Sequence, residues 1–188
     1  MPPTLVISCH ADTGFATHRL RHLADGTIEG HLDNFAGVQA VMGAYFSGRM
    51  DLPRVRIELT YGEEVDMAGA MEVAATLGPD DTVVVVDVTG APTEQAITIE
   101  KCASPALQAL VRRALEGLSY ELFSGCPDPV SDSDECDVYS EVVPRVFFLG
   151  VPCTGGDYNA GMVRCRPASL ATASEALIRI ARAFHGLT

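Results

Sequence analysis

The sequence has few basic residues and scatters them along the chain. Its 188 residues include 13 Lys and Arg against 25 Asp and Glu, which gives a formal net charge of -12 at pH 7. Binding to the phosphates of nucleic acids or to anionic membranes requires clustered basic side chains. We therefore expect neither kind of partner, although acidity alone does not identify a substrate.

Long apolar runs are also missing from the sequence. No segment approaches the length of a membrane-spanning helix, and residues 1–3 lead into an expected strand without the basic segment and apolar core of a signal peptide. The six cysteines lack the C-x-x-C spacing of metal or redox motifs. We therefore expect a cytoplasmic protein with free thiols.

The length of the chain favours one domain. A sequence of 188 residues can bury a full hydrophobic core, whereas two independent domains would be cramped. There is no internal repeat and no low-complexity linker that would mark a boundary. We expect residues 1–188 to form a single domain.

Strand-like segments alternate with helix-like segments along the sequence. Apolar or alternating patterns predict strands over 4–8, 54–60, 81–88, 96–102 and 145–150. Helical spacing predicts helices over 34–47, 67–77, 105–118 and 169–184, with a shorter one after 131–135. This βαβ rhythm predicts an α/β fold, a three-layer α/β/α arrangement in which helices cover both faces of a mixed, mostly parallel central sheet.

Acidic and imidazole residues follow several of the expected strands. They are His10, Asp12, Asp33, Glu63, Glu64 and Asp87. The carboxyl ends of parallel strands share one edge of a sheet, where ligands bind in open α/β folds, so these side chains are expected to converge. Several carboxylates in one cleft repel each other unless their pKa values rise or a cation neutralises them.

This order of motifs resembles the co-catalytic zinc exopeptidase superfamily, which includes aminopeptidases, carboxypeptidases and N-acyl-amino-acid deacylases. The motifs are H-x-D after a first strand, D-N at the start of a helix, E-E after a middle strand and a lone Asp that ends a later strand. The resemblance extends over nearly the whole chain. It implies a phosphorylase/hydrolase-like domain and a metal-dependent hydrolase of peptide or N-acyl amide bonds.

The resemblance also implies a role for each residue. His10 and Asp87 would bind the first metal ion, Asp33 would bridge two ions and Glu64 would bind the second. Asp12 would orient the imidazole of His10, as outer carboxylates of metal sites do. Glu63 would be the general base that takes a proton from metal-activated water. The peptide bond between Asp33 and Asn34 would be cis, as in the enzymes that this chain resembles.

One ligand of the family is missing. A final histidine would complete the second metal site shortly before the last helix, but residues 150–161 contain none. The nearest positional equivalents are Asp157, Tyr158 and Asn159. An amide is a poor zinc ligand, and Asp157 would serve only if its loop folds inward. We therefore expect one Zn²⁺ at the first site and a weak second site, with Mn²⁺ or Co²⁺ as alternatives.

Substrate-binding residues are hard to identify because no gap in the sequence is long enough for the lid or dimerisation insert found in many members of the superfamily. Arg164 and Arg166 are weak candidates for a carboxylate clamp, and solvated charges before a helix are the alternative. A small peptide or an N-acyl amino acid is the expected substrate. A core without a lid leaves apolar edges uncovered, which favours a homodimer.

Three interpretations of the whole chain stay open at this point. The first is a working metallohydrolase with Glu63 as base. The second is a catalytically degenerate relative that acts as a binding or assembly module. The third is an accidental likeness on an unrelated doubly wound domain, in which case Asp33, Glu64 and Asp87 would not converge.

Overall fold

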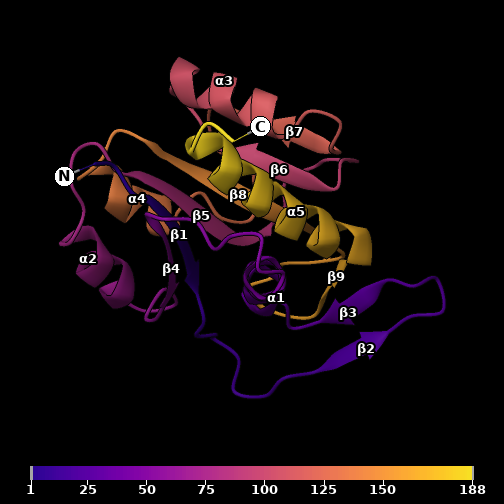
Figure 1. Cartoon of the computed structure of the whole chain (residues 1–188). Helices are drawn as coiled ribbons and strands as arrows, with labels where there is room; N and C mark the ends of the chain where they lie inside the picture. Colours follow the sequence, from indigo (N-terminus) through magenta and orange to yellow (C-terminus); the bar gives the residue numbers. More distant parts are fainter. Residues whose placement is uncertain (1, 188) are drawn as a thin grey trace.

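A nine-stranded sheet forms the centre of the computed structural model, which describes residues 2–187 (Figure 1). The strands are β1 (Leu5–His10), β2 (Leu20–His22), β3 (Ile28–Gly30), β4 (Val55–Thr60), β5 (Thr82–Thr89), β6 (Ile97–Glu100), β7 (Tyr120–Leu122), β8 (Val146–Thr154) and β9 (Val163–Cys165). Their order is β2-β3-β9-β8-β5-β1-β4, and β6 pairs with β8 and β7 on a separate branch.

The middle of the sheet is parallel. Strands β4, β1, β5 and β8 all run in one direction, and β8 continues past β5 to pair with β9 in the antiparallel sense. Strand β6 is antiparallel to β8, and the outer pair β2–β3 is antiparallel as well. The sheet is therefore mixed with a parallel core, as the sequence predicted.

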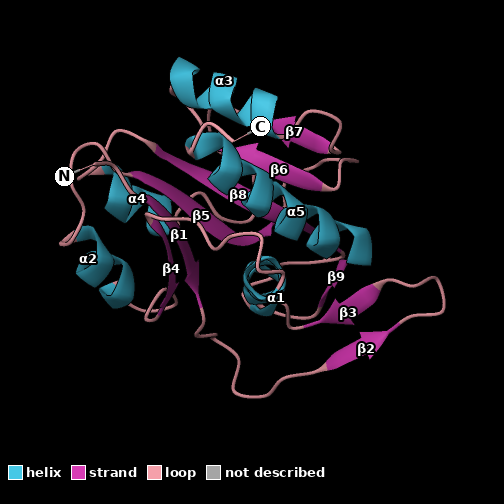
Figure 2. Ribbon diagram, in the orientation of Figure 1, coloured by secondary structure: helices cyan, strands magenta, loops and turns pink. Residues whose placement is uncertain are grey.

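Helices cover both faces of this sheet (Figure 2). They are α1 (Phe35–Phe46), α2 (Ala68–Ala74), α3 (Pro105–Ala114), α4 (Glu135–Ser140) and α5 (Pro167–Phe184). The larger core packs α1, α3 and α5 against one face, and a smaller core packs α2 and α4 against the other. The predicted three-layer α/β/α class is confirmed.

The strongest strand and the clearest helix start were both visible in the sequence. All eight residues of β5 are buried, as a run of valines covered on both faces requires. The side chain of Ser104 accepts a hydrogen bond from the backbone N–H of Leu107, and Pro105 occupies the first turn of α3. Local propensity and tertiary position agree at both places.

Four short strands were not predicted. β2, β3, β7 and β9 each contain three residues, too few for an alternating pattern to be recognised. The helices α2 and α3 end earlier than predicted, at Ala74 and Ala114, whereas β8 extends to Thr154. These differences lie at element ends, where sequence patterns are least informative.

The segment between β1 and α1 forms a hairpin, β2–β3, that projects from the body of the molecule at the lower right of Figure 1. All three residues of β2 are exposed, and Leu20 keeps 59% of its surface accessible. The six cysteines are all free, as expected. No helix in residues 2–187 combines the length and the apolar character needed to cross a membrane.

Candidate metal centre

His10 ends β1 and faces two carboxylates. Its Nε2 atom lies 3.1 Å from Asp87 Oδ2 and 3.2 Å from Asp33 Oδ1. All three residues are buried: His10 is 1%, Asp33 3% and Asp87 7% exposed. The donor atoms of this triplet lie within 4.8 Å of one another. The structure therefore brings together the three residues that the sequence assigned to the first metal.

The spacing of these donors matches the coordination shell of a small divalent ion. In tetrahedral coordination, bonds of about 2.0–2.1 Å place neighbouring donor atoms roughly 3.3 Å apart. Asp33 Oδ1 is also buried without a hydrogen-bond partner, which is costly for a carboxylate oxygen unless a cation neutralises it. Donor types, spacing and the unsatisfied oxygen all fit a metal site.

Asp12 lies on the other side of the His10 ring. Its Oδ1 is 3.4 Å from His10 Nδ1, and both atoms lack a hydrogen bond of good geometry. A carboxylate beside the second ring nitrogen would hold the tautomer in which Nε2 is free to bind a metal. The position of Asp12 is the one that the resemblance implied.

Asn34 anchors the Asp33 backbone to the sheet. Its side-chain amide donates a hydrogen bond of 2.9 Å to the carbonyl of Val86 in β5, and its Oδ1 accepts one of 2.9 Å from Gly37 in α1. A Cβ atom at Gly37 would lie 2.2 Å from that oxygen, so the close approach requires glycine. The peptide between Asp33 and Asn34 is cis, as predicted.

The three donors perturb one another electrostatically. Burial alone lowers the pKa of His10, but the neighbouring Asp87 and Asp33 carboxylates outweigh it and raise that pKa to about 12. Burial raises the pKa of Asp87 well above its usual range, and the charge of Asp33 adds to the effect. A divalent cation held between these groups would offset the same repulsion between the carboxylates.

Glu63 and Glu64 approach His10 from the loop after β4. The donor atoms of this second triplet also lie within 4.8 Å of one another. Burial raises the pKa of Glu63 to about 7, against the lowering effect of His10. Burial likewise raises the pKa of Glu64, although a backbone hydrogen bond at Gly14 opposes the shift. At this spacing, no triplet of donors in residues 2–187 joins Asp33 to Glu64.

An acidic cleft of about 40 Å³ adjoins the cluster. Six carboxylates line it, together with polar and apolar side chains: Asp33, Glu63, Asp87, Val88, Glu100, Cys126, Asp128, Ser131, Ser133, Asp134, Phe148, Tyr158 and Asn159. Lys101 pairs with Asp134 across a distance of 3.0 Å. So many like charges around so small a space favour a bound cation.

Sequence reasoning missed several acids of this site. Burial raises the pKa of Glu100 to about 7; the only sequence signal was a charge within an apolar strand. Glu135 is 1% exposed and accepts hydrogen bonds from Ser8 and Thr60. Asp128 lies in a loop rich in Pro and Asp, where one aspartate cannot be distinguished from another.

The turn 154–161 contributes two of its three candidates to the cleft. Asn159 and Tyr158 line it, and the Tyr158 hydroxyl donates a hydrogen bond of 2.8 Å to Asp128. Asp157 does not line it, because its carboxylate accepts a hydrogen bond of 2.9 Å from the backbone N–H of Asn159 and closes the turn. Of the three candidate positions for the missing histidine, Tyr158 and Asn159 therefore line the cleft and Asp157 does not.

The two arginines considered for substrate binding are engaged elsewhere. The Arg164 guanidinium lies 2.9 Å from a carboxylate oxygen of Glu29 on the neighbouring strand β3. Arg166 donates hydrogen bonds to the backbone carbonyls of Glu94 and Gln95. Neither residue lines the acidic cleft, so the structure gives no support to a carboxylate clamp at these positions.

Comparison with solved structures identifies the class of the fold. The chain superimposes on PhTET1-12s, a dodecamer, with a TM-score of 0.72 at 16% identity over 87% of this chain and 53% of that one. It superimposes on a TET aminopeptidase from the archaeon Thaumarchaeota archaeon SCGC AB-539-E09 with a TM-score of 0.71 at 14% identity, covering 91% and 55%. The chain therefore shares the fold of these two structures.

A third match agrees with the first two. An aminopeptidase of the M18 family from Thermotoga maritima gives a TM-score of 0.66 at 14% identity, covering 86% of this chain and 48% of that one. The chain thus spans about half the length of these structures. No protein-family model matches the sequence, and no curated protein matches it. The likeness establishes the fold, and the activity is a separate question.

Proposed function

We propose that this chain is a metal-dependent hydrolase of peptide or N-acyl amide bonds. The observation that carries the proposal is the buried triplet of His10, Asp33 and Asp87, in which a carboxylate oxygen without a hydrogen-bond partner faces an imidazole nitrogen at 3.2 Å. Two buried carboxylates beside a single imidazole are costly unless a cation joins them. One imidazole and two carboxylates leave at least one coordination position open, as catalytic sites do.

Each residue of the cluster has a separate task in this proposal. A divalent ion held by His10, Asp33 and Asp87 would supply a Lewis acid that polarises a carbonyl and acidifies water. Glu63 takes a proton and later returns it to the leaving amine, and its pKa of about 7 suits transfer in both directions near neutral pH. Asp12 holds the ring of His10 in place.

Zn²⁺ is the proposed ion because imidazole and carboxylate are common zinc ligands, with Mn²⁺ and Co²⁺ as alternatives. The cleft volume of about 40 Å³ holds an ion and a few waters, since each water needs roughly 10–15 Å³ of this kind of volume. A peptide therefore requires the cleft to open. Two of the residues that line it, Tyr158 and Asp128, are joined by a hydrogen bond.

The first test is metal analysis of protein purified without chelator, paired with activity assays. The substrates are a panel of aminoacyl anilides, dipeptides and N-acyl amino acids, with Zn²⁺, Mn²⁺ or Co²⁺ added in turn. We expect about one tightly bound ion per chain and hydrolysis that chelator abolishes. Protein that neither retains nor gains an ion, and hydrolyses nothing on the panel, would refute the proposal.

A second candidate function is a degenerate relative that binds without catalysis. It is favoured by Asn159, a neutral amide residue that lines the cleft in the turn where the resembling enzymes carry histidine. In that case the ion would bind but no substrate of the panel would turn over. The two candidates are therefore separated by comparing metal content with activity on the same preparation.

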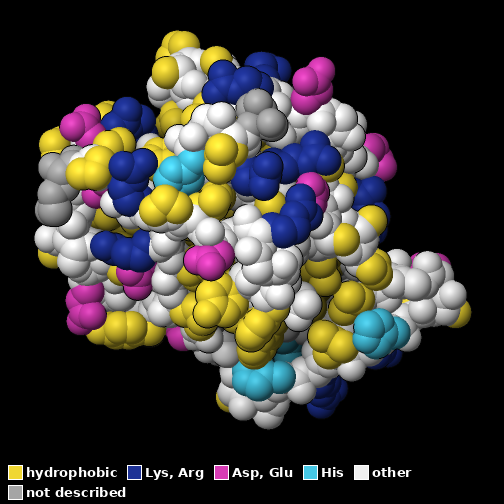
Figure 3. Space-filling view, in the orientation of Figure 1, with side chains coloured by type: hydrophobic (Ala, Val, Ile, Leu, Met, Phe, Trp, Pro, Cys, Tyr) yellow, Lys and Arg dark blue, Asp and Glu magenta, His cyan; other side chains and the backbone are white. Residues whose placement is uncertain are grey.

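We also propose that residues 1–188 are a single catalytic domain that forms a homodimer. An apolar groove of about 520 Å³ runs between α1 and the hairpin β2–β3, lined by Leu20, Ile28, Leu32, Phe35, Met42 and Leu170 among others. Hydrophobic side chains are visible in this region of Figure 3. Sedimentation velocity of the native chain and of Leu20→Ser tests the dimer, which the substitution should weaken.

A further inference from the structure

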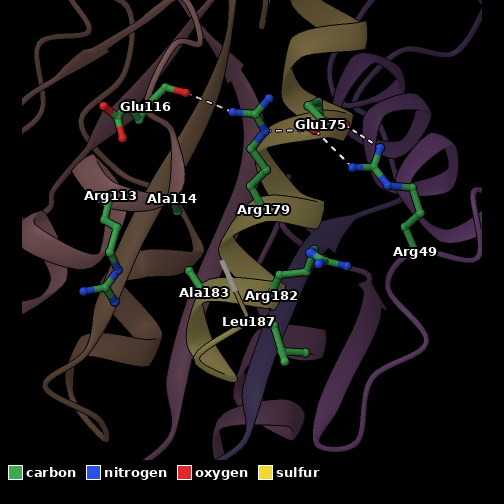
Figure 4. Close-up of a pocket in the computed structure, with 9 residues that line it drawn as sticks. All are labelled: Arg49, Arg113, Ala114, Glu116, Glu175, Arg179, Arg182, Ala183 and Leu187. Atoms are coloured by element: carbon green, nitrogen blue, oxygen red, sulfur yellow. Dashed lines mark hydrogen bonds and ion pairs between the residues drawn. The ribbon is translucent and has the colours of Figure 1, made fainter.

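A second pocket lies on the outer surface of the helical layer formed by α1, α3 and α5. Its volume is about 710 Å³, and it is lined by Arg49, Arg113, Ala114, Glu116, Glu175, Arg179, Arg182, Ala183 and Leu187 (Figure 4). We call it the arginine pocket. It shares no lining residue with the acidic cleft.

The four arginines come from three separate segments. Arg49 follows α1, Arg113 lies in the last turn of α3, and Arg179 and Arg182 lie in α5. They are four of only 13 Lys and Arg residues in a chain with a net charge of -12. Dark blue side chains gather on this face in Figure 3. The fold therefore collects basic residues that the sequence scatters.

The carboxylates of the pocket do not neutralise it. Glu175 pairs with both Arg49, at 2.6 Å, and Arg179, at 2.9 Å. Arg179 also donates to the backbone carbonyl of Glu116, whose carboxylate points away from it in Figure 4. Within residues 2–187, neither Arg113 nor Arg182 forms an ion pair. Two of the four arginines that line the pocket are thus without an ion pair among the described residues.

Helix ends explain only part of this arrangement. Basic residues in the last turn of a helix interact favourably with its dipole, which accounts for a positive charge at Arg113 and at Arg182. It does not account for the convergence of these residues with Arg49, which lies outside both helices. Like charges brought together on a surface are destabilising unless an anion joins them.

We propose that the arginine pocket binds the oligophosphate group of a small molecule. Guanidinium groups match phosphate oxygens in bidentate geometry. Arg113 and Arg182, which have no ion pair, come from different helices, so an anion with several phosphates suits the pair better than a single phosphate does. A volume of about 710 Å³ is within the range of pockets for small organic ligands. Ala114, Ala183 and Leu187 supply an apolar wall beside the charges, which suits the organic part of a nucleotide.

The test is calorimetric titration of the full chain, treated with EDTA so that the phosphates cannot bind through a metal ion in the acidic cleft. The probes are inorganic triphosphate, ATP and inorganic phosphate. We expect triphosphate and ATP to bind at least about tenfold more tightly than phosphate, because more charges are engaged. Tighter binding of ATP than of triphosphate would show that the site recognises a nucleotide. Equal binding of the two would show that it recognises the oligophosphate alone. Equal affinity for all three probes would refute the proposal.

Arg113→Gln and Arg112→Gln form a matched pair of variants. Both residues are exposed and lie in the last turn of α3, but only Arg113 lines the pocket. Arg113→Gln and Arg182→Gln should each weaken triphosphate binding about tenfold, the usual loss for a charged hydrogen bond, whereas Arg112→Gln should leave it nearly unchanged. An equal loss in the two neighbouring variants would show that net charge alone attracts the probe.

Discussion

Two sets of donors approach His10, and the fold holds them in different ways. Asp87 lies within β5, and Asp33 is tied to the same strand through the hydrogen bond from Asn34 to Val86. Glu63 and Glu64 lie in the loop that follows β4 and are only half-buried. Paired strands fix their side chains more firmly than loops do. The contrast indicates a well-defined first site and an adjustable second one.

Asp33→Ala should have the largest effect on metal binding, because it removes one of the firmly held donors. We expect the affinity for Zn²⁺ to fall by more than about 100-fold, since loss of an outer hydrogen bond alone costs 10–100-fold, and hydrolysis to be lost with it. Inductively coupled plasma mass spectrometry measures the metal content. Asp157→Ala is the control and should retain the ion; loss in both variants would make Asp157 a ligand.

Glu63→Gln tests the donors in the loop after β4, because it removes the charge of the side chain and keeps its shape. If Glu63 is the base, turnover should fall by about 10²–10⁴-fold while the metal content stays nearly unchanged. Steady-state kinetics and metal analysis are made on the same preparation. Glu64→Gln is the paired variant and should weaken the second ion. Should the two variants lose metal equally, the roles of Glu63 and Glu64 have been exchanged.

Asn159→His tests whether a further ligand can be added to the second set of donors, Glu63 and Glu64. Asn159 lines the acidic cleft, and an imidazole there would add a strong donor where the family carries one. We expect the affinity for a second ion to rise by roughly tenfold or more. Isothermal titration of the apo protein measures the stoichiometry. Two tight ions already present in the unmodified chain would mean that the turn supplies a ligand as it stands.

Glu100→Gln should have the smallest effect, and it acts on stability. Burial raises the pKa of Glu100 from 4.5 to about 7. Between these values the folded state holds a proton that the unfolded state has lost, so the free energy of unfolding falls as pH rises through this window. Above it the loss is at most about 3 kcal/mol. The glutamine variant should therefore be more stable than the native chain at pH 8, by about 1–3 kcal/mol, and not at pH 4.

Urea unfolding of EDTA-treated protein at the two pH values measures this difference. Thr98 donates a hydrogen bond of 2.5 Å to the Glu100 carboxyl, which glutamine can still accept, so the packing is retained. Glu94→Gln, a change at a residue that does not line the cleft, is the control for loss of one charge. A native chain whose stability does not change across the window would contradict the raised pKa.

The parallel centre of the fold could be predicted because its strands have clear apolar sequence patterns. The valines of β5 and the apolar run of β1 need burial on both faces, and the intervening segments have helical spacing. The hairpin β2–β3 and strand β9 could not be predicted. Strand β3 pairs with β9, and β9 pairs with the last residues of β8. Strand β8 extends four residues beyond the predicted end at 150.

Some residues of the candidate site could likewise be predicted from the sequence, and others could not. His10 ends the apolar run of β1, and Asp87 follows the valines of β5. These two strands are parallel neighbours, so the approach of the two residues follows from the topology. Asp128 reaches the cleft from an irregular loop, and Glu100 reaches it from β6, which runs antiparallel to β8. Sequence periodicity does not predict where an irregular loop or an antiparallel strand will lie relative to this cleft.

The order of the three firmly held donors along the chain has a consequence for folding. His10, Asp33 and Asp87 come from three distant positions in the sequence, and only the assembled β1, β5 and α1 bring them together. In the denatured ensemble, closing loops of this length costs conformational entropy, so the unfolded chain offers no preformed binding site. An ion with affinity for the native state alone would raise the free energy of unfolding by mass action. A chain that holds such an ion would populate the unfolded, protease-sensitive state less often than a chain without one.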